Sequence, residues 1–300
     1  MKVVCSPRYH IDVGPHVFPT AKYALVCQRL VDRGLVDERT LVEPAAATWD
    51  ELGLVHTSHY LAKLRDGRLT IGEVARLELP WSPEAVEGFR LMAGGTLTAA
   101  RHALADGLAV HVGGGLHHAH PDHGEGFCMF HDVAVAIRVL RRDGLDGVVA
   151  VVDADVHQGN GTAAIFAEAH DVFTLSVHQA NNYPAIKPPS TLDVELPDGI
   201  GDEAYLRALE PALEAVVASR PRLAFYLAGA DPYRDDQLGG LSLSFDGLRR
   251  RDAVVLSALR AAGAAVVVTL AGGYARRVDD TVAIHVATIE EAFAIAQNAL

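Results

Sequence analysis

The sequence has little of what secreted and membrane proteins require. Three cysteines among 300 residues are too few and too scattered for a disulfide framework or a structural zinc site. Its apolar runs, such as 148–152 and 264–271, are far shorter than the ~20 residues that a membrane span needs. The N-terminus carries one basic residue before an apolar run too short for a signal peptide. We therefore expect a soluble, cytoplasmic protein.

Basic charge is also scarce. Lys and Arg number 26 against 38 Asp and Glu, which gives a formal net charge of -12. Nucleic-acid binding needs clustered basic residues, and the one dense run, Arg249, Arg250 and Arg251, is predicted to lie on a solvated helix face. We expect neither a nucleic-acid nor a membrane partner, and the oligomeric state stays open. A cationic substrate or product would suit this charge.

Short β-branched apolar runs alternate with segments rich in Ala and Leu. The predicted strands are 3–5, 108–112, 147–152, 172–177, 223–228 and 264–270, and the predicted helices are 85–105, 133–142, 203–219, 248–262 and 282–299. The strands are continuous apolar runs without alternation, which is typical of parallel strands covered on both faces. The sequence thus predicts one α/β domain over residues 1–300, with right-handed crossovers.

Ligands of parallel sheets bind beyond the carboxyl ends of the strands. Asp155 and His157 follow one predicted strand, and Asp231 follows another. Residues two apart on a strand share a face, so Asp155 and His157 can meet at one point. A single strand-end aspartate is more often a cap or turn residue, but three such ligands favour a metal site. Three ligands and an open position are typical of catalytic zinc, and Fe2+ would also accept this set.

Other strand ends carry His117, His118 and Tyr274, each beside glycine. An imidazole titrates near neutral pH, so one ring can accept a proton from water and later protonate a leaving group. The phenol of Tyr274 can stabilise an oxyanion. Consecutive histidines also occur on protein surfaces, however, and a tyrosine after two glycines also occurs as a packing aromatic in a turn. Cys128 has apolar neighbours that raise its thiol pKa, which argues against a nucleophilic cysteine.

These motifs, in this order along the chain, resemble the zinc-dependent histone deacetylase family, which includes bacterial histone deacetylase-like amidohydrolases and acetylpolyamine amidohydrolases. The matching stretches are Gly113–His118, Gly126–Cys128, Val152–Gly161, Ser176–His178, Gly229–Asp231 and Gly272–Tyr274. Phe18–Tyr23 and Leu238–Ser244 are most similar to the class IV branch and its bacterial relatives. The resemblance implies the arginase–deacetylase fold, an α/β fold of three layers (α/β/α) with a mostly parallel sheet of eight strands.

The resemblance also implies roles for individual residues. Asp155, His157 and Asp231 would hold zinc, and His118 would be the general base and acid, with His117 as its electrostatic neighbour. Tyr274 would polarise the acyl carbonyl.

A structural potassium ion is implied as well. Asp153 would be the partner of His117 and a ligand of this K+. The K+ site would be completed by Asp155, His157, Ser176 and the carbonyl of Val177.

Substrate contacts follow from the same comparison of motifs. Gly126 and Phe127 match one wall of an acyl-lysine tunnel, and Tyr183 matches the other. Lys22 stands where relatives have an arginine that lines an acetate-release cavity.

Two positions depart from some family members. Asn160 stands behind His118, where class I members have an aspartate. Members of classes II and IV share this asparagine. Because an amide cannot stabilise an imidazolium as a carboxylate does, we expect a lower pKa for His118. No residue in 79–87 matches the loop aspartate that anchors the substrate backbone in other classes.

The predicted activity is zinc-dependent hydrolysis that removes an acetyl or longer acyl group from N-ε-acyl-lysine or a related acylated amine. Acetylpolyamines or other small amides are the alternative substrates. A binuclear manganese ureohydrolase would need a further carboxylate, whereas Gln158 and Gly159 follow His157. An inactive acyl-lysine binder is the remaining alternative, although every catalytic position is filled.

Overall fold

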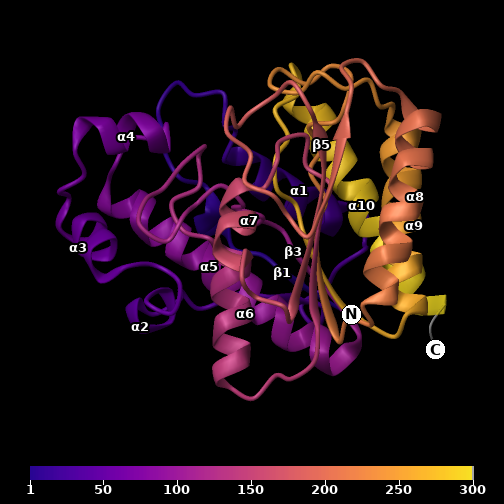
Figure 1. Ribbon diagram of the computed structural model, residues 1–300, viewed down its shortest axis with the longest axis horizontal. Helices are drawn as coiled ribbons and strands as arrows, with labels where there is room; N and C mark the ends of the chain where they lie inside the picture. The colour runs from indigo at the N-terminus through magenta and orange to yellow at the C-terminus, as the bar shows by residue number, and fades with distance from the viewer. Residues whose placement is uncertain (299–300) are drawn as a thin grey trace.

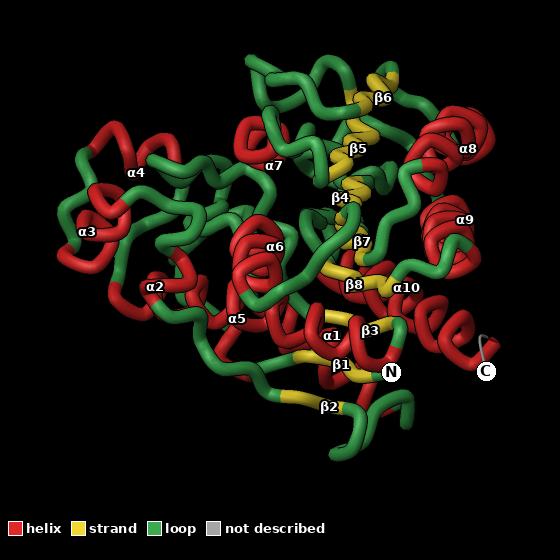
Figure 2. Tube along the Cα trace, turned by 60° about the horizontal axis from the view of Figure 1, so that its bottom comes forward, coloured by secondary structure: helices red, strands yellow, loops and turns green. Residues whose placement is uncertain are grey.

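The computed structural model describes residues 1–298, and within them a parallel sheet of eight strands lies between two layers of helices (Figures 1 and 2). The strands are β1 (Lys2–Val4), β2 (Leu41–Val42), β3 (Leu108–His111), β4 (Val149–Asp153), β5 (Val172–Gln179), β6 (Leu192–Leu196), β7 (Leu223–Leu227) and β8 (Ala265–Thr269). Their order is β2-β1-β3-β8-β7-β4-β5-β6, and every pairing is parallel. The predicted three-layer fold is confirmed.

The six predicted strands match β1, β3, β4, β5, β7 and β8 to within a few residues. The two strands that the sequence analysis missed, β2 and β6, form the edges of the sheet. Neither has the apolar signal of a central strand, because β2 has two residues and β6 is mostly half-exposed.

The helices are α1 (Ala21–Asp32), α2 (Trp49–Leu52), α3 (Ser58–Asp66), α4 (Ile71–Leu77), α5 (Pro83–Asp106), α6 (Asp132–Arg142), α7 (Asn160–Phe166), α8 (Asp202–Ala218), α9 (Phe245–Ala261) and α10 (Val278–Asn298). The longest, α5, begins where Ser82 caps the helix ahead of Pro83, and it ends at Gly107 in the left-handed conformation. The predicted helix 282–299 corresponds to α10, and position 299 lies outside the described residues.

The two faces of the sheet bury two separate cores. Along β4, Val149 and Val151 belong to the core under α5 and α6. Ala150 and Val152 belong to the opposite core, which includes residues of α1, α8, α9 and α10. This double coverage explains why β4 is a continuous apolar run. No helix within residues 1–298 combines the length and hydropathy needed to cross a bilayer.

Cys5, which follows β1, forms a disulfide with Cys27 of α1. The three scattered cysteines predict no disulfide framework, and 22 residues separate this one pair along the chain. The two cysteines meet because α1 packs on the face that buries β1: Val26 belongs to the same core as Val3. The cellular compartment stays a prediction.

The structure corrects the interpretation of the basic run on α9. Arg249 and Arg250 are exposed as predicted, but Arg251 is 0% exposed. Its Nη1 donates to the carbonyls of Ala154 (3.2 Å) and Gly229 (2.7 Å), which lie in the loops that follow β4 and β7. Position 251 falls on the inward face of α9, so its guanidinium ties these two loops together.

Replacing Arg251 with methionine is expected to lower the free energy of unfolding by about 3–5 kcal/mol, because the substitution leaves buried Asp252 without its cation. The Nε atom of Arg251 donates to Asp252 at 2.9 Å. The matched control is Arg250→Met, which loses an exposed pair with Glu203 worth about 0–1 kcal/mol. Urea unfolding of both variants measures the difference, and equal midpoints would contradict a structural role for Arg251.

Candidate active site

The loops after β4 and β7 bring three predicted metal ligands together. Asp155, His157 and Asp231 are buried, and one ligand atom from each lies within 4.8 Å of the others. Nδ1 of His157 is 3.0 Å from Oδ1 of Asp155 and 3.4 Å from Oδ2 of Asp231. The two carboxylates and the imidazole therefore converge on one point, as the spacing predicts.

Backbone amides hold the two carboxylates in place. The amide of Val156 donates to Oδ1 of Asp231 at 2.9 Å, and the amide of Gly272 donates to Oδ2 of Asp155 at 2.8 Å. Position 272 requires glycine, because a Cβ there would collide with both carboxylates. Oδ1 of Asp231 and Oδ2 of Asp155 are thus fixed, whereas the other oxygen of each carboxylate faces His157.

The cluster has the chemistry of a cation site. Oδ2 of Asp231 is buried and has no hydrogen-bond partner among the described residues. Burial lowers the pKa of His157, but the hydrogen bond to Asp155 and the charges of Asp155 and Asp231 outweigh it and raise the pKa to about 10. The same negative environment favours a divalent ion, and one nitrogen and two carboxylate donors suit Zn2+ or Fe2+.

His117 and His118 lie beside this cluster with ring centroids 4.0 Å apart. Nδ1 of His117 donates to Oδ2 of Asp153 at 2.7 Å, and Nδ1 of His118 donates to Oδ1 of Asn160 at 2.7 Å. Burial opposes a charge on His117, but Asp153 and Asp155 raise its pKa to about 9.

His118 has the opposite electrostatic environment. Burial first, and then the neighbouring charges of His117 and His157, hold the pKa of His118 well below its usual value. His118 is therefore a neutral imidazole whose Nδ1 proton is directed at Asn160, which leaves Nε2 as the proton acceptor.

Tyr274 and Lys22 complete the buried side of the site. The amide of Tyr274 donates to Oδ2 of Asp236 at 2.6 Å. Burial, with the charges of Asp155 and Asp231, raises the pKa of the Tyr274 phenol well above its usual value, so the phenol stays a hydrogen-bond donor. The ammonium of Lys22 donates to the Ala271 carbonyl at 2.9 Å and lies 5.5 Å from the centre of the Tyr274 ring.

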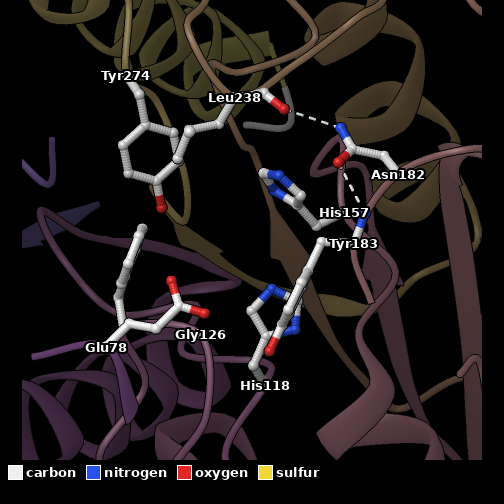
Figure 3. Close-up of a pocket in the computed structure, with 9 residues that line it drawn as sticks. Glu78, His118, Gly126, His157, Asn182, Tyr183, Leu238 and Tyr274 are labelled. Carbon is white, nitrogen blue, oxygen red and sulfur yellow. Dashed lines mark hydrogen bonds between the residues drawn. The ribbon is translucent and has the colours of Figure 1, made fainter. Parts of the chain in front are cut away.

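A pocket of about 150 Å³ opens onto these groups (Figure 3). Its lining residues are Glu78, His118, Gly126, Phe127, His157, Asn182, Tyr183, Leu238 and Tyr274. The ring of Tyr183 stands edge-to-face against that of His118, with ring centroids 5.0 Å apart. The rings of Phe127 and Tyr274 also pack edge-to-face, with centroids 5.8 Å apart. A Cβ at position 126 would lie 2.7 Å from the His118 ring, so glycine keeps this wall open. The three predicted wall residues, Gly126, Phe127 and Tyr183, thus line one pocket.

A second, inner cavity of about 20 Å³ lies behind the first. Both cavities share His118, Gly126, Phe127 and Tyr274 as lining residues. Lys22 is not among the residues that line the inner cavity, but its ammonium lies over the rings of three that do, Phe18, Tyr23 and Tyr274. Burial lowers the pKa of Lys22 to about 8, although Asp231 and Asp155 oppose this shift.

Three of the five residues predicted to bind potassium lie on adjacent strands, and the other two, Asp155 and His157, lie in the loop after β4. Asp153 of β4 pairs in register with Ser176 of β5, and Val177 is the next residue of β5. The hydroxyl of Ser176 is 3.0 Å from Nδ1 of His178. The potassium ion itself stays a prediction.

The sequence matches the histone deacetylase domain over residues 16–289. The chain belongs to the histone deacetylase family. Histone deacetylase 2 of Arabidopsis thaliana is 34% identical over 271 residues, which cover 86% of this chain and 70% of that protein.

A second member of this family is similarly close. The histone deacetylase-like amidohydrolase of Pseudomonas aeruginosa is 34% identical over 264 residues, or 80% of this chain and 68% of that protein. The crystal structure of a histone deacetylase homologue from Aquifex aeolicus aligns with a TM-score of 0.81 at 24% identity, covering 97% of this chain and 84% of that one. This last likeness concerns the fold alone.

Three residues of the pocket were missed by the sequence analysis: Glu78, Asn182 and Leu238. Glu78 ends α4 with a left-handed φ of 59° and lies one residue before the stretch 79–87, where no anchoring carboxylate was found. No motif marks Glu78. It reaches the pocket because it follows α4, a short helix that was not predicted. Strand-end position identifies residues on the sheet edge, whereas these three come from other segments.

Proposed function

We propose that this member of the histone deacetylase family is a zinc-dependent amidohydrolase, and that residues 1–300 form one catalytic domain. Its reaction is removal of an acetyl or longer acyl group from N-ε-acyl-lysine or a related acylated amine. One observation carries the proposal: a pocket reaches His157, one member of the buried cluster that it forms with Asp155 and Asp231, beside the uncharged imidazole of His118. The relative named as an amidohydrolase supports the reaction class.

Asp155, His157 and Asp231 would hold the zinc ion, which when bound supplies Lewis-acid activation of water and of the acyl carbonyl. His118 accepts a proton from the attacking water at Nε2 and returns it to the departing amine nitrogen. The phenol of Tyr274 donates to the acyl oxygen as negative charge develops there. The C–N bond breaks, and the products are a carboxylate and a free amine.

The supporting residues have separate tasks in this proposal. Asp153 keeps His117 oriented, and Asn160 keeps the Nδ1 proton of His118 in place so that Nε2 faces the substrate. Potassium near Asp153 and Ser176 would stabilise the loop that carries Asp155. The ammonium of Lys22 would attract the carboxylate product behind the pocket.

The pocket walls favour an acylated alkyl amine. Phe127 and Tyr183 would enclose a neutral alkyl stem, while Glu78 at the exposed rim would accept a cationic or backbone N–H group. The same carboxylate suits a second ammonium group, which favours acetylpolyamines as the alternative substrate class. A bridged manganese pair has less support, since the amide of Gln158 donates to the Pro188 carbonyl at 2.6 Å.

A turnover panel tests the proposal. The zinc-loaded protein is expected to hydrolyse acyl-lysine peptides, and comparing acetyl with longer acyl chains and with acetylpolyamines identifies the preferred substrate. Binding without turnover of any of these amides would favour the inactive binder instead. Urea release from guanidino substrates with manganese would favour a ureohydrolase. Liberated amine and carboxylate are quantified separately in each reaction.

A further inference from the structure

A second group of metal-ligating side chains lies outside the site described above. His120, His123 and Glu125 belong to the loop between β3 and α6, and one ligand atom from each lies within 4.8 Å of the others. All three are half-exposed and line an open pocket of about 600 Å³ on the far side of Tyr183. The proposed reaction uses none of them.

His123 is oriented as metal-binding histidines are. Its Nδ1 donates to Oδ1 of Asp122 at 2.7 Å, and its Nε2 is 3.3 Å from Oε2 of Glu125. A carboxylate on the far nitrogen fixes the ring and makes the near nitrogen a better ligand. With Nδ1 protonated, Nε2 and the Glu125 carboxylate face each other as electron-pair donors. Either a proton or a metal ion must therefore lie between them.

His120 adds a third donor at the same point. Its ring stacks on that of His123 with centroids 4.5 Å apart and planes inclined by 11°. Because an imidazole lone pair lies in the plane of its ring, the half-exposed His120 ring must turn out of this stack to bind the same ion. Nε2 of His120 accepts from the Asn160 amide at 3.3 Å, so this nitrogen also carries a lone pair. The amide of His120 donates to the His123 carbonyl at 2.9 Å, which closes the loop and keeps the two residues close together.

We propose that His120, His123 and Glu125 bind a second divalent transition-metal ion, for which Zn2+ is the natural probe. Two ligands of one tetrahedral zinc ion lie about 3.3 Å apart, which matches the separation of His123 from Glu125. Two imidazoles and a carboxylate favour Zn2+ over Mg2+ or Ca2+. Arg76 lines the same pocket and opposes a cation, but Glu78, Asp122 and Glu125 outnumber it.

The second site is connected to the candidate active site through one side chain. Asn160 accepts from His118 with Oδ1 and donates to Oε1 of Glu125 with Nδ2 at 2.6 Å. A metal ion that engages Glu125 and His120 competes for both acceptors of this Nδ2 group. Occupancy of the second site should therefore loosen the position of His118 and lower kcat, an effect that rests on the proposed function.

Zinc binding to the wild-type protein and five variants tests the proposal by equilibrium dialysis with elemental analysis. The wild-type protein is expected to bind two zinc ions per chain, His123→Asn and His157→Asn one each, and the double variant none. His102→Asn, at a half-exposed histidine of α5 outside both clusters, is the control and should bind two. Asp122→Asn should weaken the second site about tenfold, and Mg2+ should not compete.

The outcomes separate the two proposals. One zinc ion on the wild-type protein, or a second one that His123→Asn retains, would overturn the second site without touching the first. If His157→Asn instead binds as the wild type does, the candidate active-site metal is wrong while the second site stands. The kcat of the wild type should fall as the second zinc ion binds, whereas His123→Asn should keep its kcat across the same zinc range. Circular dichroism spectra and melting temperatures verify that the variants are folded.

Discussion

Asp231→Asn is expected to lower the affinity of the candidate active site for zinc by about 100-fold or more and to abolish measurable turnover. The amide keeps the oxygen that accepts from Val156, so the loop after β7 should retain its position. What is lost is the negative charge of the buried, unpartnered Oδ2 beside His157. Zinc content after stoichiometric loading and the rate of amide hydrolysis measure the two effects.

The matched control is Asp235→Asn, which changes an exposed aspartate of the same loop and should leave both quantities unaltered. Chelation of the wild-type protein should remove activity that added zinc restores, and the Asp231 variant should not be rescued at the same zinc concentration. Full activity of Asp231→Asn with stoichiometric zinc would mean that this carboxylate is not a ligand.

His118→Ala and Tyr274→Phe are each expected to lower kcat by about 10²–10⁴-fold while zinc content stays at the wild-type level. The first variant removes the proton acceptor that Asn160 orients, and the second removes the phenol that burial keeps protonated. Because both groups act in one transition state, the double variant should lose less than the product of the two effects.

Tyr60→Phe is the control for loss of a buried phenol, since its hydroxyl donates to the Met129 carbonyl at 2.8 Å, and Tyr60 does not line the pocket. This control should lose stability but keep kcat. Loss of zinc from His118→Ala would assign that residue to metal binding, and wild-type turnover by either variant would remove it from the proposed chemistry.

The central part of the fold could be predicted because burial on both faces makes the inner strands continuous apolar runs. Apolar residues fill β3, β7 and β8 with little interruption, and each apolar run reaches a glycine within three residues of the end of its strand. The edge strands β2 and β6 escape this logic, since one is too short and the other retains polar residues on a half-exposed surface.

Residues at strand ends were predictable because the parallel topology alone places Asp155, Asp231 and Tyr274 at one edge of the sheet. The basic run on α9 shows the opposite case. Three consecutive arginines indicate a solvated surface when considered as charges, but a helix turns about 100° per residue, so the third can point inward. Only tertiary packing reveals that Arg251 meets the carbonyls of Ala154 and Gly229.

The hydrogen bond between Asn160 and Glu125 has a consequence for how this chain can change during evolution. An aspartate at position 160 would place a second carboxylate against Glu125, where the amide now donates at 2.6 Å, and like charges at that range repel. Substitutions at positions 125 and 160 are therefore epistatic: Asn160→Asp should be tolerated only once Glu125 has become neutral, for example glutamine. Glu125, which does not line the active-site pocket, thus restricts which residue can replace Asn160 behind His118.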